Sequence, residues 1–314
     1  MKIAFFGTPD FAAASLKRLI EDGHEILAAF TRPDMPKGRG YKLTPPPVKE
    51  LALEHGIPVF QPTKLKNGEV ARQLTEMSPD IVVVVAYGRL LPKAILDVPP
   101  LGCVNVHGSL LPAYRGSSPI QWTVLNGKKE AGVTTQYMAE GMDCGDIILQ
   151  KSTPVGENET SAELYDRLEA LGAQCLSETM KLFEGGKKAP SVPQDESKAS
   201  PAPMLEKAMG KLDFSKSAQE VHNWIRGMNS WPSAFTKYKG KLLKVHHSEV
   251  AEQEGRLGSP GEVIDPENFV VACGKGAVRF TEVQLEGAKR LDSKTFLRGK
   301  SLAKGDILGE NESK

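Results

Sequence analysis

Short apolar runs alternate with helical patterns through the first half of the chain. The runs KIAFFG, EILAAFT, IPVFQ, DIVVVVAYG and GCVNVHG are strand-like. Between them, DFAAASLKRLIEDGH, VKELALEHG and EVARQLTEM place apolar residues at helical spacing. The β-branched run in DIVVVVAYG is typical of a strand buried on both faces. The alternation predicts an α/β fold with a doubly wound, mostly parallel, Rossmann-like sheet.

The pattern changes in the second half. SAELYDRLEALGAQCLSETMKLFEGG is typical of a long helix that stops at glycine, and the stretch KKAPSVPQDESKASPAP that follows is rich in Pro, Ser and Lys. After it, one helical pattern, SAQEVHNWIRGM, precedes the short strand-like runs AFTKYKG, KLLKVHHSEV, GEVID, FVVAC and AVRFTEVQ. Such a series is typical of a small β-barrel. We therefore expect an α/β domain over 1–188, a linker over 189–205 and a barrel domain over 206–314.

Composition and charge narrow the class of protein only a little. The chain is 40% hydrophobic and 25% charged with a net charge of +1, which by itself does not argue for nucleic-acid binding. The excess of basic residues lies in 207–314, where 18 Lys and Arg face 14 Asp and Glu. A mildly basic barrel is suited to a phosphate backbone, and a solvated surface explains the same charge about as well.

The cysteines and the first residues bear on where the protein acts. The four cysteines lie far apart without a CxxC pair, which indicates reduced thiols in a cytoplasmic protein. The opening run MKIAFFGTPD is too short for a signal peptide or a membrane span, and no later run approaches that length. We expect no association with a membrane.

Familiar nucleotide and hydrolase motifs are missing. The sequence has no P-loop, no HExxH and no GxSxG, and the GRG at 38–40 lacks the third glycine of a dinucleotide fingerprint. These absences argue against an NTPase, an ordinary dehydrogenase and a serine hydrolase.

Polar residues gather where one apolar run ends, in NVHGSLLPAYRGSSPI. Asn105 and His107 are two residues apart, so both side chains lie on one face of an extended strand. In doubly wound sheets, ligands bind beyond the carboxyl ends of the strands. Asp143, in the later stretch GMDCGDIILQ, is an acid that can orient and charge the imidazole, and Asn105 can donate to an oxyanion. A turn that merely holds a histidine remains the alternative, and a zinc site of His107, Asp143 and Cys144 lacks the usual ligand spacing.

A long basic loop, TRPDMPKGRGYKLTPPPVK, separates a predicted strand from a predicted helix. It carries Arg32, Lys37, Arg39 and Lys42 with flexible glycines. Irregular loops of this length inside a domain are usually functional or disordered. A loop that orders on phosphates and a loop that is merely solvated fit the composition equally well.

Three motifs in combination resemble a known family. FGTPDFA at 6–12, NVHGSLLP at 105–112 and GMDCGD at 141–146 resemble the formyltransferases that use 10-formyltetrahydrofolate, and among them those that act on methionyl-tRNA. The resemblance extends over nearly the whole chain, through DMPKGRGYKLTPPPVK, VVVAYGRLLP, GSSPIQWTVLNG and the NSWP at 229–232. The chain departs from the family pattern at Cys144, where Thr is more usual, at KLDF in 211–214 and at Ser230.

The resemblance implies an enzyme that transfers a formyl group from 10-formyltetrahydrofolate to methionine on initiator methionyl-tRNA, without a metal, as a monomer. It implies a catalytic domain over 1–188 and an OB-like tRNA-binding domain over 206–314. The residues it assigns are the catalytic Asn105, His107 and Asp143, the folate-binding Arg89, Leu90, Leu91, Ser109, Leu110, Leu111 and Pro112, and the tRNA-binding Lys37, Arg39 and Lys42. The loop before Asp143 would help to line the pterin pocket.

Three other functions compete with this one. A sugar-nucleotide formyltransferase would share the catalytic trio and the folate, but it does not need the basic loop. A purine-pathway formyltransferase would leave about 100 residues after the linker unexplained. A non-catalytic RNA-binding protein would explain the loop and the barrel but leave the polar cluster at 105–109 without a role, and it should not bind folate.

Overall fold

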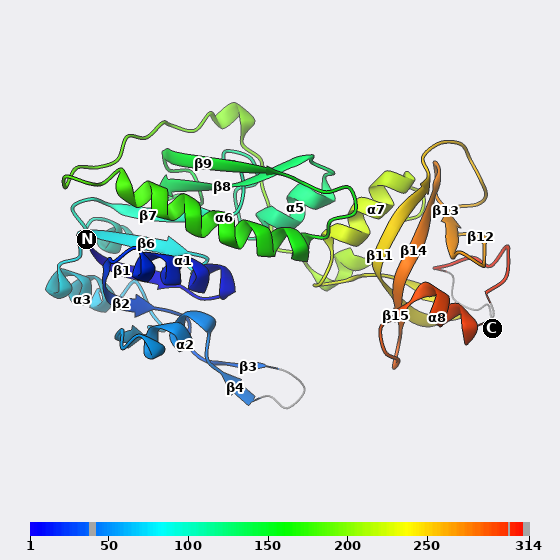
Figure 1. The fold of residues 1–314 in the computed structure, drawn as a ribbon, viewed down its shortest axis with the longest axis horizontal. Coiled ribbons are helices and arrows are strands. Elements are labelled where there is room, and N and C mark those ends of the chain that lie inside the picture. The colour runs from blue at the N-terminus through cyan, green and yellow to red at the C-terminus, as the bar shows by residue number, and fades with distance from the viewer. Residues whose placement is uncertain (38–41, 301, 310–314) are drawn as a thin grey trace. The chain divides into compact units, whose positions relative to one another are not determined.

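The computed structural model describes residues 1–37, 42–300 and 302–309 (Figure 1). The chain divides into two compact units. The first unit comprises Met1–Pro119, Ala131–Thr153 and Tyr165–Pro203. The second comprises Ile120–Glu130, Pro154–Leu164 and Met204–Lys314. In the described part of the chain, no helix is long and apolar enough to cross a bilayer.

A seven-stranded sheet forms the centre of the first unit, in the order β5-β2-β1-β6-β7-β8-β9. Five neighbouring strands are parallel, and β8 pairs antiparallel with β7. The strands are β1 (Lys2–Gly7), β2 (Glu25–Phe30), β5 (Val59–Phe60), β6 (Ile81–Val85), β7 (Cys103–His107), β8 (Glu130–Tyr137) and β9 (Ile147–Pro154). The Rossmann-like sheet predicted from the alternating pattern is confirmed.

Helices cover both faces of this sheet. They are α1 (Asp10–Glu21), α2 (Pro47–Glu54), α3 (Glu69–Met77), α4 (Lys93–Leu96) and α6 (Ser161–Lys181). On one face, Phe6 stacks on Phe30 with ring centroids 4.4 Å apart, and Leu74 of α3 joins the same buried cluster. On the other face, α1 contacts α6 through the rings of Phe11 and Tyr165. Because both faces are buried, β6 contains only apolar residues, as the run IVVVV predicts.

The order of the strands locates the region where a ligand binds. From β1 the chain passes through α1 to β2 on one side, whereas β6 lies on the other side of β1. The strand order therefore reverses between β1 and β6, and ligands of such sheets bind beyond the carboxyl ends of the strands at this point. His107, the last residue of β7, lies at that edge, next to the end of β6.

The basic loop contains two short paired strands that the sequence did not reveal. Strands β3 (Met35–Lys37) and β4 (Lys42–Thr44) pair antiparallel, and the backbones of Lys37 and Lys42 are partners. The expectation of a wholly irregular loop is therefore wrong for these six residues. Arg39, which was predicted to contact tRNA, lies outside the described residues.

An antiparallel sheet forms the core of the second unit, in the order β10-β11-β14-β13-β12, with β15 beside β14. Its strands are β10 (Ala234–Tyr238), β11 (Lys241–Glu252), β12 (Val263–Asp265), β13 (Val270–Ala272), β14 (Ala277–Leu285) and β15 (Leu291–Asp292). Its helices are α5 (Pro119–Leu125), which begins at the last residue of the first unit, α7 (Ala218–Gly227) and α8 (Ser293–Arg298). The short strand-like runs thus form strands of one antiparallel sheet, and closure of this sheet into the predicted small barrel stays a prediction.

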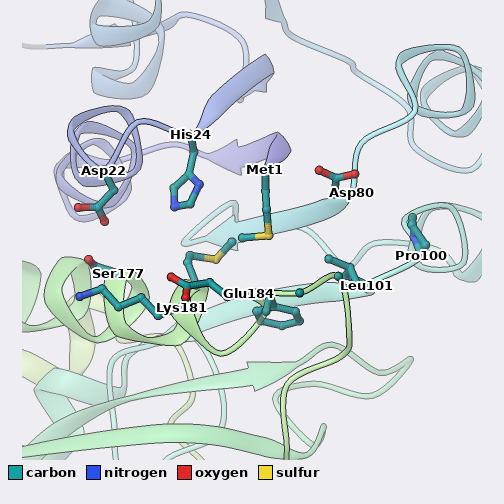
Figure 2. Close-up of a pocket in the computed structure, with 13 residues that line it drawn as sticks. Met1, Asp22, His24, Asp80, Pro100, Leu101, Ser177, Lys181 and Glu184 are labelled. Atoms are coloured by element: carbon teal, nitrogen blue, oxygen red, sulfur yellow. The ribbon is translucent and has the colours of Figure 1, made fainter.

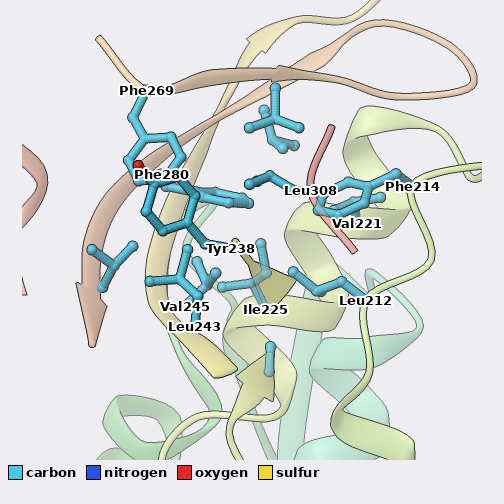
Figure 3. Packing of buried hydrophobic residues seen from close by; sticks show 14 of the residues in the cluster. Leu212, Phe214, Val221, Ile225, Tyr238, Leu243, Val245, Phe269, Phe280 and Leu308 are labelled. Atoms are coloured by element: carbon cyan, nitrogen blue, oxygen red, sulfur yellow. The ribbon is translucent and has the colours of Figure 1, made fainter. Parts of the chain in front are cut away.

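Helix α7 provides one wall of this core. A capping box of Ser217 and Glu220 fixes its first turn, which satisfies two backbone N–H groups. Val221 and Ile225, one turn apart on the same face, point into a cluster that contains Phe280 of β14 (Figure 3). This apolar stripe accounts for the helical spacing of apolar residues in SAQEVHNWIRGM.

Most of the predicted linker is part of the first compact unit. Between residues 189 and 203 the chain belongs to the first unit, where Ile147 and Val192 form an antiparallel bridge and Tyr137 Oη donates to the carbonyl of Ala189. A short 3-10 helix, η1 (Glu196–Lys198), lies within it. A second, η2 (Lys207–Gly210), opens the C-terminal part of the second unit. The segment therefore contributes to the structure of the first unit.

Candidate active site

Two segments that are distant in sequence bring His107 and Asp143 together. His107 ends β7, and Asp143 lies in the loop between β8 and β9. The distance from His107 Nδ1 to Asp143 Oδ2 is 3.6 Å, and both side chains are largely buried. This distance is slightly longer than a hydrogen bond, and the two groups form an ion pair only when the imidazole is protonated. The pairing expected from the sequence is present.

The second ring nitrogen of His107 fixes its tautomer. His107 Nε2 lies 2.9 Å from the backbone carbonyl oxygen of Tyr114. A carbonyl oxygen only accepts, so Nε2 carries a proton and donates it. Nδ1 is then the nitrogen that faces Asp143 and is able to exchange a proton. The bond to Tyr114 therefore orients the imidazole for work at Nδ1.

Two N–H donors hold the carboxylate of Asp143. The backbone N–H of Gly116 donates to Oδ2 over 2.9 Å, and Gln136 Nε2 donates to Oδ1 over 3.4 Å. Asp143 itself adopts a left-handed backbone conformation with φ 51°. Strained residues of this kind persist where the surroundings fix them, and they concentrate at functional sites.

Glycine is required two residues after Asp143. A Cβ built on Gly145 would lie 1.7 Å from the carbonyl oxygen of Tyr137, which no side chain tolerates. The close approach of this loop to β8 therefore explains the D-x-G spacing. It also places Asp143 at the edge of the sheet beside β7.

Asn105 has an uncommitted amide. It is half-buried and lines a small cavity of ≈ 20 Å³ together with Gln136, Asp143 and Gly145. That space holds about one water molecule. Within the described residues, the side chain of Asn105 makes no hydrogen bond, so its N–H groups are available to an oxygen that develops negative charge.

The predicted folate residues after His107 form a braced loop. The Ser109 hydroxyl donates to the carbonyl of Ala113 over 2.6 Å, and the Leu111 N–H donates to Thr134 Oγ1 over 3.1 Å. Gln150 Nε2 donates to the carbonyl of Leu111 over 2.9 Å. The side chains of Ser109 and Leu111 are buried, whereas Leu110 and Pro112 are partly exposed. The structure thus gives this loop a fixed shape, and its contact with folate stays a prediction.

The predicted residues after β6 differ in their exposure. Arg89 donates from Nη1 to the carbonyls of Pro62 and Thr63, at 2.9 and 3.1 Å. Leu91 is buried, but the side chain of Leu90 is 61% exposed. Of these three, Leu90 therefore exposes an apolar side chain, and the contact of all three with folate stays a prediction.

Sequence reasoning missed residues that hold the site. Gln136 lies directly opposite Asn105 in the β7–β8 ladder. The register of β8 against β7 is therefore the signal that would have identified Gln136 as a residue of the site. Gln194, in the predicted linker, donates to the carbonyls of Asp143 and Gly145 over 2.9 and 2.7 Å. No periodicity in that Pro- and Ser-rich segment indicates such a role.

The zinc alternative finds no ligand set in the part of the chain that the structure describes. No group of three His, Cys, Asp or Glu residues there is arranged to hold a metal ion.

A separate cavity of ≈ 510 Å³ lies at the amino ends of the parallel strands (Figure 2). It is lined by His24, Asp80 and residues of α6, and both His24 and Asp80 directly precede strands. It therefore lies at the amino ends of β2 and β6, away from His107.

Cys144 is expected to be the first thiol that an alkylating reagent modifies in the native protein. Burial raises the pKa of Cys103 to about 12, of Cys175 to about 11 and of Cys273 to about 12, so these thiols hold almost no thiolate at pH 8. Cys144 is only partly buried beside Asp143. Peptide mass mapping after brief iodoacetamide treatment should find the label on Cys144, and a Cys144→Thr variant should stay unlabelled. Equal labelling of Cys175 in native protein would contradict this.

Comparison with known proteins places these features in a family. Residues 1–180 match the family model described as formyl transferase, and residues 204–301 match that of the formyl transferase C-terminal domain. The chain is 48% identical to the methionyl-tRNA formyltransferase of Alkaliphilus oremlandii, with 99% of this chain and 100% of the relative aligned. It is 45% identical to that of Acetivibrio thermocellus over the same shares of the two chains.

Solved structures share the fold at low identity. A sugar 3N-formyltransferase, WlaRD, solved with dTDP and 5-N-formyl-THF, aligns with a TM-score of 0.70 at 19% identity, over 92% of this chain and 99% of that one. HypX from Aquifex aeolicus, solved with tetrahydrofolic acid, aligns with a TM-score of 0.64 at 20% identity, over 99% of this chain and 51% of that one. Together with the two family matches, the full-length relatives establish that this chain belongs to the formyl transferase family.

Proposed function

We propose that this enzyme transfers the formyl group of 10-formyltetrahydrofolate to the α-amino group of methionine on initiator methionyl-tRNA. The product is N-formylmethionyl-tRNA, the form used to initiate translation. The observation that carries the proposal is the sequence identity of 45–48%, over 99% of the chain, to curated methionyl-tRNA formyltransferases. The pairing of His107 with Asp143 at the carboxyl ends of the strands supports it, because ligands of such sheets bind there and polar groups stabilise the oxyanion that forms in acyl transfer.

The reaction exchanges one carbon–nitrogen bond for another. The neutral α-amine attacks the formyl carbon and gives a tetrahedral intermediate whose oxygen is negatively charged. The bond from that carbon to N10 of the folate then breaks. The attacking nitrogen loses one proton and N10 gains one, so the products are formylated methionyl-tRNA and tetrahydrofolate.

The three predicted catalytic residues have distinct parts in this proposal. The uncommitted amide of Asn105 donates to the oxygen of the intermediate. His107, fixed through Nε2, donates to the same oxygen from Nδ1 when it is protonated. Asp143 stabilises the positive imidazole and accepts a proton from the attacking amine through water.

The remaining assignments also belong to the proposal. The folate would lie against the loops at 89–91 and 109–112, where Leu90 offers an exposed apolar side chain. The tRNA would meet the basic loop through Lys37, Arg39 and Lys42, and the C-terminal domain over 206–314 would hold its body. The four free cysteines support a cytoplasmic location. The monomeric state and the domain bounds stay predictions.

Acceptor specificity tests this function. The wild-type chain, 10-formyltetrahydrofolate and methionyl initiator tRNA should yield N-formylmethionyl-tRNA, measured as formylmethionine after hydrolysis of the ester. A dTDP-linked amino sugar, offered under the same conditions, should stay unformylated. Transfer to the sugar but not to the tRNA would overturn the proposed acceptor, while failure to bind folate would overturn the reaction class.

A further inference from the structure

The chain between the two family matches, residues 181–203, contains a segment that reaches the candidate active site. We propose that residues 194–202, named here the bridging segment, position both His107 and Asp143 for formyl transfer, with Gln194 and Ser200 as positioning residues. This inference rests on the proposed function for its reaction. All of the residues involved belong to the first compact unit.

Gln194 holds the loop that carries Asp143. Its Nε2 donates to the backbone carbonyls of Asp143 and Gly145, over 2.9 and 2.7 Å, and also faces Gln136 Oε1 at 3.1 Å. Gln136 in turn donates to the Asp143 carboxylate. One amide group therefore fixes the backbone of Asp143 directly and its carboxylate through Gln136.

Arg115 determines which way the Gln194 amide points. Its Nε and Nη2 both donate to Gln194 Oε1, at 3.0 and 2.8 Å, and Glu196 accepts from the same guanidinium at 2.7 and 2.9 Å. A guanidinium only donates, so the amide oxygen must face Arg115 and the amide nitrogen must face the Asp143 loop. The hydrogen-bonding partners of Gln194 therefore determine the orientation of its side-chain amide.

The other end of the bridging segment holds the loop that orients His107. Ser200 Oγ accepts from the backbone N–H of Tyr114 over 3.0 Å, and the Ser200 carbonyl accepts from the N–H of Arg115 over 2.8 Å. The N–H of Ala202 donates to the carbonyl of Arg115 over 2.7 Å. Tyr114 is the residue whose carbonyl receives the His107 Nε2 proton.

The loops held in this way adopt conformations that need support. Tyr114 and Asp143 have φ values of 64° and 51°, which residues other than glycine rarely adopt. Gly116, whose N–H binds the Asp143 carboxylate, has φ 128°, and a Cβ there would lie 2.6 Å from the carbonyl oxygen of Ala202. The bridging segment is thus packed directly against the residues that set the His107–Asp143 distance.

The test is a double-mutant cycle measured on the full-length chain. Gln194→Leu should lower kcat for formylation of methionyl-tRNA by roughly 10- to 100-fold, with the KM for the tRNA little changed, because it displaces the reacting groups by a fraction of an ångström. In an Asp143→Asn background, the same change should cost almost nothing further, because Gln194 acts through Asp143. Ser197→Ala, an exposed change in the same segment, should match the wild type.

Three results would overturn the inference: an unchanged kcat in Gln194→Leu, a loss that multiplies with that of Asp143→Asn, or an equal loss in Ser197→Ala. If Gln194→Leu does not fold, as thermal unfolding would show, Ser200→Ala takes its place, and its loss should vanish in a His107→Ala background.

A second measurement separates this inference from the proposed function. If the wild type does not formylate methionyl-tRNA, the proposed function fails. The ring ¹⁵N resonances of His107 then test the bridging segment without any acceptor. They should differ between wild type and Gln194→Leu and coincide between wild type and Ser197→Ala. Identical His107 resonances in all three proteins would overturn the positioning role.

Discussion

His107→Ala is expected to lower kcat for formyl transfer by two to three orders of magnitude. The imidazole is buried, its Nε2 is committed to the carbonyl of Tyr114, and its Nδ1 faces Asp143 at 3.6 Å. Alanine removes the proposed donor to the oxyanion, and loss of one such donor typically costs 10²- to 10³-fold, or about 3–4 kcal/mol of transition-state stabilisation. Single-turnover transfer at saturating folate and methionyl-tRNA isolates this chemical step.

The control for this variant is another histidine of the same unit. His24→Ala removes a partly buried imidazole that precedes β2, at the amino edge of the sheet. It should reduce the transfer rate by much less than tenfold. Affinity for the folate should survive in both variants, since the imidazole acts on the developing charge and not on the bound cofactor. A rate for His107→Ala close to wild type would contradict the role of the N-x-H pair.

Parts of this site were predictable because local chemistry determines them. The two-residue spacing of Asn105 and His107 gives both one face of β7, and the end of a parallel strand is where ligands bind. The apolar run before them predicts a buried strand, and β7 is such a strand. These inferences need only the period of a strand and the topology of the sheet.

The partner of His107 was harder to predict. Asp143 lies in a different loop, and nothing in the periodicity of either segment states that the two loops meet. The residues offered Asp143 only as one acid able to orient the imidazole, and the resemblance of the combined motifs to a family supported that pairing. In the structure, the link is the tight contact of Gly145 with the carbonyl of Tyr137, a backbone approach that side-chain patterns do not reveal.

The bridging segment could not be predicted for a related reason. It lies within the stretch KKAPSVPQDESKASPAP, whose composition is typical of a linker because it offers little apolar surface for burial. It is ordered instead by hydrogen bonds from one amide, one hydroxyl and the backbone, namely those of Gln194, Ser200 and Ala202. The composition of a segment indicates how much apolar surface it can bury, but it does not predict polar contacts of this kind.

Gly145→Ala is expected to damage the site through the backbone alone. Its Cβ would lie 1.7 Å from the carbonyl oxygen of Tyr137 and 2.8 Å from the carbonyl carbon, so the loop must move by more than an ångström. Both neighbours are backbone atoms of β8, which cannot rotate away as a side chain would. Asp143 moves with the loop, and a displacement of that size costs about 10²-fold in rate. Strain of this kind also destabilises a fold by about 1–3 kcal/mol, so the thermal midpoint should fall by several degrees.

Gly56→Ala separates the two effects. Gly56 has φ +66°, so alanine is strained there, but a Cβ would meet nothing within 4 Å and the residue lies just beyond α2. Its thermal midpoint should fall by an amount set by about 1 kcal/mol of strain, with kcat unchanged. If Gly145→Ala lost only stability, its kcat at a temperature where it stays folded would equal that of Gly56→Ala. We expect it to be about a hundredfold lower, because the same carbonyl contact that excludes a methyl group at Gly145 fixes the carboxylate of Asp143 beside His107.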